Sequence, residues 1–370
     1  MKVFFSLLVI LFGFIGTDAQ AQRVLSGAVV SPVVQPVVQE RSVKIEKVEP
    51  IQYEAAGIST LRRIKQRDKV RCGTNLQLKC YAYREDEIWY GIDADFCKAI
   101  ALAVVGDADR IEMVNVEDND VSRALQSGRI DVMLSGATVN AGAEIKRGIM
   151  PVGVLYYEPQ MLMMSDRDGK EDDDFINKKI CVAEGSDYFR NYEMFNLEHD
   201  LRSKYLKFPS TKAVREGFLL KRCDMATAGA VYLNGMKQAM AKSNFKIFPE
   251  PIAAAPVMAA VARGNDGFGL AVKWVINGLQ LAEQYGMNAK NLSFFRAHNN
   301  PEIRNLMGDN SALWEALGLY PKWLDQAVAL VGNYGAIFER NVGAESDYKI
   351  KRGQGKLLKD GGVIYPEPFL

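Results

Sequence analysis

Short apolar segments alternate with amphipathic segments along most of this chain, and this alternation restricts the possible folds more than any other feature. The stretches "VRCGTN", "IEMVNV" and "IDVMLSG" are typical of buried strands, and "VSRALQSGR" has the apolar spacing of a helix. A second group of short apolar segments separated by helical ones begins at "INKKICVAEG". Strands that alternate with helices predict an α/β protein with parallel sheets, and two such groups within 370 residues predict two lobes.

Several helices have recognisable ends in the sequence. Ser59 is a good N-cap for a short amphipathic helix in "TLRRIKQRDK". After a polar, turn-rich loop, residues 89–106 predict a helix that stops at Gly106. The C-terminal part is mainly helical, because segments 270–286 and 322–341 both carry apolar residues at helical spacing.

The N-terminus has the pattern of an export signal. Lys2 precedes an apolar run over residues 3–15 that is too short to span a bilayer comfortably, and Ala19-Gln20-Ala21 supplies small residues for cleavage. We therefore predict a signal peptide over residues 1–21, cleaved after Ala21, and a protein of the bacterial periplasm. The residue directly after the cleavage site is not a cysteine, so it cannot carry a lipid anchor. An uncleaved membrane anchor is the alternative.

Residues 22–57 differ in composition from the rest of the chain. The stretch "VVSPVVQPVVQERSVKIEKVEP" repeats Val-Val beside Pro and Gln. Proline removes backbone donors and favours extended structure, so this segment predicts a flexible Val/Pro-rich tail. Its valines leave open an extended strand that lies against the protein or a partner.

Five cysteines suit an oxidising compartment, where disulfides persist. The simplest count is two bridges and one remaining thiol, and local pairing joins Cys72 to Cys97 and Cys181 to Cys223, which leaves Cys80. The alternative is five buried thiols.

The charged residues and the histidines exclude several function classes. The chain has 46 Lys and Arg against 45 Asp and Glu, so we expect no nucleic-acid partner. The two histidines, His199 and His298, are far apart in sequence, and no Cys-x-x-Cys pair is present. A metal site and Ser-His-Asp chemistry therefore have few residues to build on, and we expect no metal and no other cofactor.

Five motifs make the sequence specific. The stretches "WYGIDADFCKAIA", "ALQSGRIDVML", "KRCDMA", "NPEIRNLMG" and "VGNYGAIFERNVG" occur in the order and spacing of the periplasmic amino-acid-binding proteins of ABC importers. The chain resembles this family, solute-binding protein family 3, and especially its general L-amino-acid-binding branch. The resemblance implies a type II periplasmic binding protein, in which two lobes flank a cleft and closure about a hinge captures a solute.

The same resemblance implies a division of the chain. Lobe one is expected to hold residues 58–157 and 258–370, and lobe two residues 158–257. The family's inter-lobe strands match "LYYEPQMLMM" and "AAAPVMAAV", which we expect to cross between the lobes. The implied partners are a small-molecule solute and an ABC permease of the inner membrane, and we expect a monomer.

The residues that clamp a zwitterion in this family are altered here. The resemblance implies an arginine on lobe one for the carboxylate, helix N-terminal amides on lobe two, and an acid on lobe two for the ammonium group. Ala143 stands at the position of the arginine, and Asn140 at that of a threonine. Residues 184–187 replace the turn Ser-Gly-Thr-Thr, and Gly229 replaces the aspartate. The positions that keep the family pattern are Tyr81, an aromatic that stacks on the ligand, Thr138, and Gln160 at the crossing.

We interpret these changes as a cleft rebuilt for another amino-acid-like solute that is neutral or cationic, because an unpaired buried charge is costly. The expected ligand-binding residues are Tyr81, Thr138, Asn140, Gln160, Glu184, Ser186 and Asp187. Lys146 and Arg147 offer a displaced carboxylate anchor only if their loop shifts. Two alternatives remain: a degenerate fold that serves as a protein-interaction module, and an enzyme with Glu184 and Asp187 as acid and base. We expect no enzyme.

Overall fold

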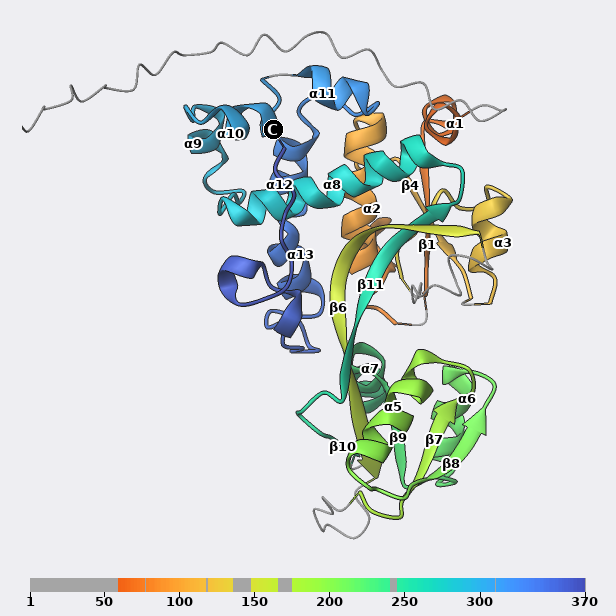
Figure 1. The fold of residues 1–370 in the computed structure, drawn as a ribbon. Coiled ribbons are helices and arrows are strands. Elements are labelled where there is room, and N and C mark those ends of the chain that lie inside the picture. Colours follow the sequence, from red (N-terminus) through yellow and green to blue (C-terminus); the bar gives the residue numbers. More distant parts are fainter. Residues whose placement is uncertain are drawn as a thin grey trace, which may run out of the picture. The chain divides into compact units, whose positions relative to one another are not determined.

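One mixed sheet forms the frame of the protein. The computed structural model describes residues 59–76, 78–117, 119–135, 148–165, 175–239, 245–309 and 311–369, all within the unit Lys47–Leu370. The strands of the sheet follow the order β4-β1-β5-β11-β6-β9-β7-β8, and β10 pairs with β6 (Figure 1). Their bounds are β1 (Val70–Thr74), β4 (Ile111–Asn115), β5 (Val132–Met133), β6 (Ile149–Ser165), β7 (Lys179–Ala183), β8 (Lys204–Phe208), β9 (Met225–Gly229), β10 (Phe245–Ile247) and β11 (Ala253–Ala262).

The expected parallel pairing holds on both sides of the sheet and is wrong at its centre. Strand β1 pairs in parallel with β4 and β5, and β7 pairs in parallel with β8 and β9. In the centre, β11 pairs antiparallel with β5 and β6, and β6 pairs antiparallel with β9. The reason is that β6 and β11 run in opposite directions between the two groups of strands (Figure 1). The two stretches expected to cross, "LYYEPQMLMM" and "AAAPVMAAV", lie within these strands.

The helices cover the sheet and extend the C-terminal part. Their bounds are α1 (Thr60–Arg67), α2 (Ile92–Val105), α3 (Val121–Gln126), α5 (Asp187–Glu198), α6 (Thr211–Leu219), α7 (Ala230–Ala239), α8 (Asp266–Gln284), α9 (Leu292–Arg296), α10 (Pro301–Leu306), α11 (Ser311–Ala316), α12 (Trp323–Leu330) and α13 (Tyr334–Asn341), with short 3-10 turns at Gly353–Gly355 and Leu358–Asp360. The most deeply buried helices are α2 and α8, which pack on each other and share the largest apolar core with α12 and α13.

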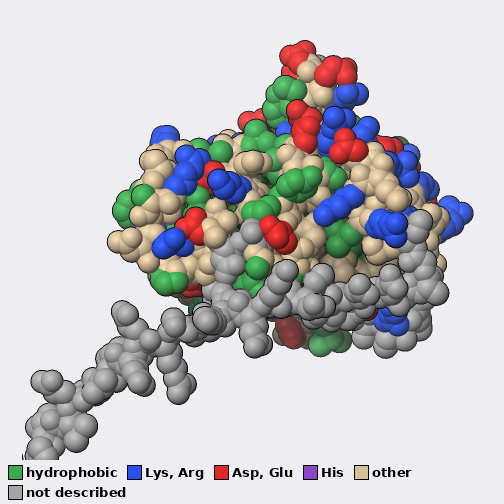
Figure 2. Space-filling view, turned by 90° about the horizontal axis from the view of Figure 1, so that it is seen from above, with side chains coloured by type: hydrophobic (Ala, Val, Ile, Leu, Met, Phe, Trp, Pro, Cys, Tyr) green, Lys and Arg blue, Asp and Glu red, His purple; other side chains and the backbone are tan. Residues whose placement is uncertain are grey.

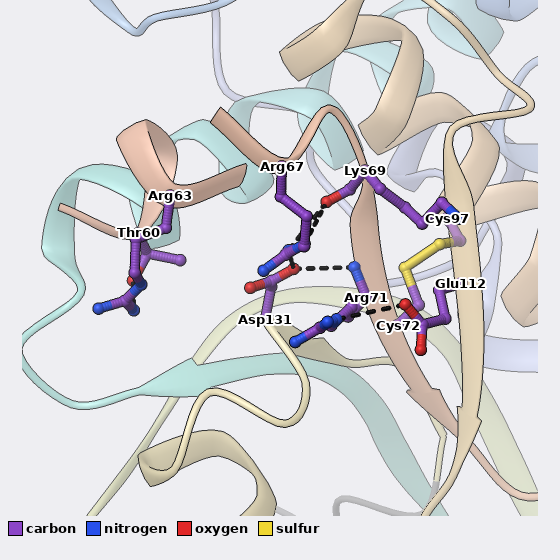
Figure 3. A network of polar contacts seen from close by, with 9 residues as sticks. All are labelled: Thr60, Arg63, Arg67, Lys69, Arg71, Cys72, Cys97, Glu112 and Asp131. Carbon is purple, nitrogen blue, oxygen red and sulfur yellow. Dashed lines mark hydrogen bonds and ion pairs between the residues drawn. A yellow bond between two sulfur atoms is a disulfide. The ribbon is translucent and has the colours of Figure 1, made fainter. Parts of the chain in front are cut away.

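Helix α1 and strand β1 are held together by the polar network of Figure 3. Ser59 caps α1 as expected, since its side chain accepts a hydrogen bond from the backbone of Arg62. At the other end of α1, Arg67 forms an ion pair with Asp131. The same carboxylate accepts a hydrogen bond of 2.8 Å from the backbone N–H of Arg71 in β1. Asp131 therefore fixes the end of α1 against the start of β1 and the approach to β5.

Two disulfides form between the cysteines that local pairing predicts. Cys72 in β1 bonds to Cys97 in α2, with the Cα atoms 6.2 Å apart. Cys181 in β7 bonds to Cys223 just before β9, with a Cα–Cα distance of 5.6 Å. Cys80 is a buried free thiol. Each bridge joins elements that already pack together, so each cross-links one group of strands and helices locally.

The structure departs from the predicted elements in two places. The loop before α2 contains a hairpin of β2 (Tyr83–Glu85) and β3 (Ile88–Tyr90), which the polar composition conceals. Segment 322–341 is two helices, because Gly332 has a φ of 84° and Asn333 caps α13 by accepting a hydrogen bond from the backbone of Ala336. Glycine adopts this left-handed conformation without the penalty that a side chain would bring.

The outer face of the helical layer carries mixed chemistry. Basic, acidic and hydrophobic side chains are interspersed there (Figure 2). Exposed ion pairs such as Arg296–Asp325 and Arg304–Asp309 belong to this layer. Among the described residues, no helix combines the length and apolar character needed to cross a membrane.

Candidate functional site

The expected ligand-binding residues gather partly around the middle of β6. Tyr81 lies in the loop between β1 and β2 and is 9% exposed. Thr138 and Asn140 lie outside the described residues, as does Ala143. For the other four expected residues the contacts are defined, and their ligand-binding role stays a prediction.

Gln160 in β6 joins three elements through its side-chain amide. Its Nε2 donates to the backbone carbonyl of Tyr188 at 2.8 Å and to the hydroxyl of Thr227 at 2.9 Å. Its Oε1 accepts a hydrogen bond of 2.9 Å from the side chain of Asn191. Gln160 is 2% exposed, and both polar atoms of its side chain are hydrogen-bonded. It therefore positions the start of α5 and strand β9 relative to β6.

Ser186, and not Asp187, caps helix α5. The Ser186 hydroxyl accepts a hydrogen bond from the backbone N–H of Phe189 at 3.1 Å and donates one to the carbonyl of Ala183 at 2.7 Å. Asp187 is the first helical residue and forms an ion pair with Arg190 one turn later. Asp187 is therefore not the cap, because the serine hydroxyl, one residue earlier, already satisfies the free backbone donor.

Glu184 lies at the surface just after β7. Its side chain is 66% exposed, and it approaches Lys207 of β8 at 3.8 Å. Glu184 and Asp187 therefore face different basic partners, Lys207 and Arg190. The pair of Glu184 and Lys207 is exposed and contributes little to stability, because water screens it.

Two buried carboxylates that the sequence did not single out lie beside the expected residues. Glu158, two residues before Gln160 in β6, is 7% exposed, and Asp93, in the first turn of α2, is fully buried. Burial raises the pKa of Glu158 to about 7, and hydrogen bonds from the backbone of Val231 and the hydroxyl of Tyr188 oppose this rise. Burial likewise raises the pKa of Asp93 to about 7, against hydrogen bonds from Thr74 and Ser135.

Aromatic hydroxyls and one thiol surround these carboxylates. Burial raises the pKa of Tyr81 and Tyr156 well above the ordinary value, and the charge of Glu158 raises both further. Burial also raises the pKa of the Cys80 thiol, with smaller contributions from Glu158 and Asp93. These residues form one acidic cluster, which we call the crossing cluster. It consists of the buried residues Cys80, Tyr81, Asp93, Tyr156 and Glu158 and of the half-buried Tyr188 from α5.

A signal in the sequence points to this cluster in retrospect. Glu158 is the one charged residue in the crossing stretch "LYYEPQMLMM", which is otherwise mainly apolar and aromatic. An ionisable side chain inside such a stretch needs a partner, because burial of an unpaired charge is costly.

The described residues hold no group of three or more His, Cys, Asp and Glu side chains arranged to bind a metal ion. A groove lies elsewhere, between α8, the first half of β6 and the C-terminal segment, with Lys273, Asn277 and Gln280 among its lining residues. None of the expected ligand-binding residues lines this groove.

Comparisons with known proteins give consistent relatives. No family model matches the chain. It is 31% identical over 321 residues to the general L-amino acid-binding periplasmic protein AapJ of Rhizobium johnstonii, which covers 85% of this chain and 94% of that protein. It is 29% identical over 319 residues to the glutamate/glutamine/aspartate/asparagine-binding protein BztA of Rhodobacter capsulatus, with the same coverage. A solved structure of an ABC transporter periplasmic binding protein from Brucella ovis with glutathione bound superposes with a TM-score of 0.76 at 29% identity, over 84% of this chain and 99% of that one.

Proposed function

Because the chain belongs to the family of amino-acid-binding proteins of ABC transporters, we propose that it captures an amino-acid-like solute that is neutral or positively charged and delivers it to an ABC permease of the inner membrane. The observation that carries the solute-capture role is the relationship to AapJ, which extends over 85% of this chain. The type II periplasmic binding fold and the two crossing strands agree with this role. Its relatives are binding proteins, which favours solute capture over the protein-interaction alternative and over an enzyme.

The proposed preference for neutral or cationic solutes rests on the charges near β6. Glu158 and Asp93 are buried there, and neither forms an ion pair with any described basic residue. Ala143 stands where the family has its carboxylate-binding arginine. The additional side-chain carboxylate of an acidic amino acid would be repelled in such surroundings, so acidic amino acids are unfavourable ligands.

We place the protein in the periplasm as a monomer. The name of AapJ describes a periplasmic protein, and residues 1–21 have the pattern of a signal peptide cut after Ala21. N-terminal sequencing of protein isolated from the periplasm tests the cleavage site, and sedimentation of the same material tests the monomer.

A thermal-shift screen of the mature protein tests the function. The panel contains neutral, basic and acidic L-amino acids, polyamines, glutathione and sugars, and a ligand at 100 times its Kd stabilises the protein by about 2.7 kcal/mol. We expect a shift with at least one neutral or basic compound and weak or no binding of glutamate and aspartate. The absence of any shift across the panel contradicts solute capture, and micromolar binding of glutamate contradicts the charge preference.

A further inference from the structure

The carboxylate of Glu158 lies where a side chain on the neighbouring strand β9 would otherwise be, and this strand has a glycine at that position. Strand β9 pairs with β6, and its last residue, Gly229, lies opposite Gln160. A methyl group at position 229 would lie 2.1 Å from Glu158 Oε1 and 2.7 Å from Oε2. The carboxylate therefore lies directly over the Cα atom of Gly229, at the junction of β6, β9 and the start of α7.

This carboxylate is incompletely bonded. Oε2 accepts a long hydrogen bond of 3.4 Å from the Tyr188 hydroxyl, and the backbone of Val231 at the start of α7 donates another hydrogen bond to the carboxylate. Oε1 is buried and has no hydrogen-bond partner among the described residues. Asp93 Oδ1 and the Tyr156 hydroxyl are in the same condition. Three buried polar atoms of one cluster thus lack partners, although such atoms are normally paired.

The surroundings of the crossing cluster supply no positive charge from the described chain. The groups that face Glu158 are Tyr188 from α5, the backbone of Val231 from α7, Tyr156 from β6, and Tyr81 and Cys80 from the loop after β1. Asp93 from α2 acts on two of the same groups, Tyr156 and Cys80. All of the side chains among them are neutral or acidic. The basic partners in this region, Lys207 and Arg190, pair with Glu184 and Asp187 instead.

We propose that Glu158, assisted by Asp93, binds the positively charged nitrogen group of the solute, an ammonium or a guanidinium, against the aromatic rings of Tyr81 and Tyr156. This inference rests on the proposed solute capture and adds the residue that recognises the charge. A cation in this place gives the free carboxylate oxygens the donors that they lack, and charge-assisted hydrogen bonds of this kind are about twice as strong as neutral ones. Aromatic faces add a further attraction for cations.

Proton release follows from the same arrangement. In the ligand-free protein the pKa of Glu158 is about 7, so a large fraction of this carboxyl group is protonated at neutral pH. A bound cation favours the charged carboxylate and lowers its pKa, and the proton leaves to solvent. For one group of pKa 7, affinity for the cation is about tenfold weaker at pH 6 than at pH 8.

Titration calorimetry tests the proposal with two sets of probes. L-lysine, L-arginine and putrescine carry ammonium or guanidinium groups, whereas succinate and D-glucose carry none. Each probe is titrated into the wild-type protein at pH 6, 7 and 8, and at pH 7 in two buffers of different ionisation enthalpy, which reports proton release without any substitution. Glu158→Gln removes the charge at constant shape, Asp93→Asn tests the assisting carboxylate, and Glu198→Gln is the matched control on the exposed end of α5.

We expect at least one of the nitrogen-bearing probes to bind the wild type with proton release and with about tenfold higher affinity at pH 8 than at pH 6. Affinity at pH 8 should fall at least tenfold in Glu158→Gln, fall less in Asp93→Asn, and stay unchanged in Glu198→Gln. Equal affinity in the wild type and Glu158→Gln, or binding without proton release, overturns the proposal. Binding of succinate or glucose alone overturns it while solute capture stands, and the absence of binding by every compound of both panels overturns solute capture itself.

Discussion

Glu158 should make the ligand-free protein less stable as pH rises from about 4.5 to about 7. Its pKa in the folded protein is raised from the ordinary value of 4.5 to about 7, mainly by burial. Between these two values the folded state holds a proton that the unfolded state has lost. The free energy of unfolding therefore falls as pH rises across this window, and the loss is complete above pH 7.

The size of this loss follows from the two pKa values. Each tenfold change in proton affinity corresponds to about 1.4 kcal/mol, so the change from 4.5 to about 7 corresponds to about 3 kcal/mol. Glu158→Gln keeps the shape of the side chain and cannot ionise. Relative to the wild type, this variant should therefore gain about 3 kcal/mol between pH 4.5 and pH 8.

Urea unfolding of the ligand-free wild type and Glu158→Gln between pH 4.5 and pH 8 measures this difference. Asp93 titrates in both proteins, so subtraction of the two curves isolates Glu158. The cost of an unsatisfied amide in the variant is the same at every pH and shifts the curve without changing its slope. Parallel curves for the two proteins over the whole range would refute the assignment of a buried, titrating carboxyl group to Glu158.

Three further predictions concern stability at neutral pH. Replacing Cys181 and Cys223 together by serine removes a disulfide that joins residues 42 positions apart, and the chain-entropy model predicts a loss of about 4 kcal/mol in the free energy of unfolding. Denaturant unfolding of the variant and the wild type measures this loss, and the wild type under reducing conditions is the reference. Arg352→Met leaves the carboxylate of Glu283, whose side chain is 15% exposed, without its bidentate partner and should cost about 3 kcal/mol in chemical denaturation; a loss below 1 kcal/mol would contradict a strong, largely buried pair. Asn300→Ala removes the N-cap of α10 and should lower stability by about 1 kcal/mol, whereas Asn300→Asp should preserve it.

Local sequence determined the elements because their signals lie within a few residues. Ser59 caps α1, Gly106 ends α2 in a left-handed conformation, and the apolar runs that predict strands form β1, β4 and β7. The disulfide pairing was accessible for the same reason, since each pair joins neighbouring elements of one group of strands and helices. The resemblance to amino-acid-binding proteins was carried by motifs that lie in sequence order, and the relationship to AapJ confirms it.

The sequence did not reveal which basic residues pair with the acids of the candidate site. Glu184 and Asp187 are close in sequence to the helix start that carries the family's ligand contacts, yet they pair with Lys207 and Arg190. These basic partners come from β8 and from the next turn of α5, and only side-chain directions in the folded chain decide such pairs. The three hydrogen bonds from Gln160 to Tyr188, Thr227 and Asn191 were likewise not predictable from the sequence, and its role as a ligand contact stays a prediction.

The crossing cluster is a product of tertiary structure alone. Glu158 and Asp93 are 65 positions apart, and Gly229 follows Glu158 by 71, so no local pattern relates them. The antiparallel pairing of β6 with β9 and the packing of α2 behind the loop of Tyr81 bring them to one place. The sequence shows that an acidic residue lies within an apolar strand. The pKa of this residue depends on how much water the neighbouring elements exclude and on which hydrogen-bond donors lie within reach. Both are properties of the folded chain.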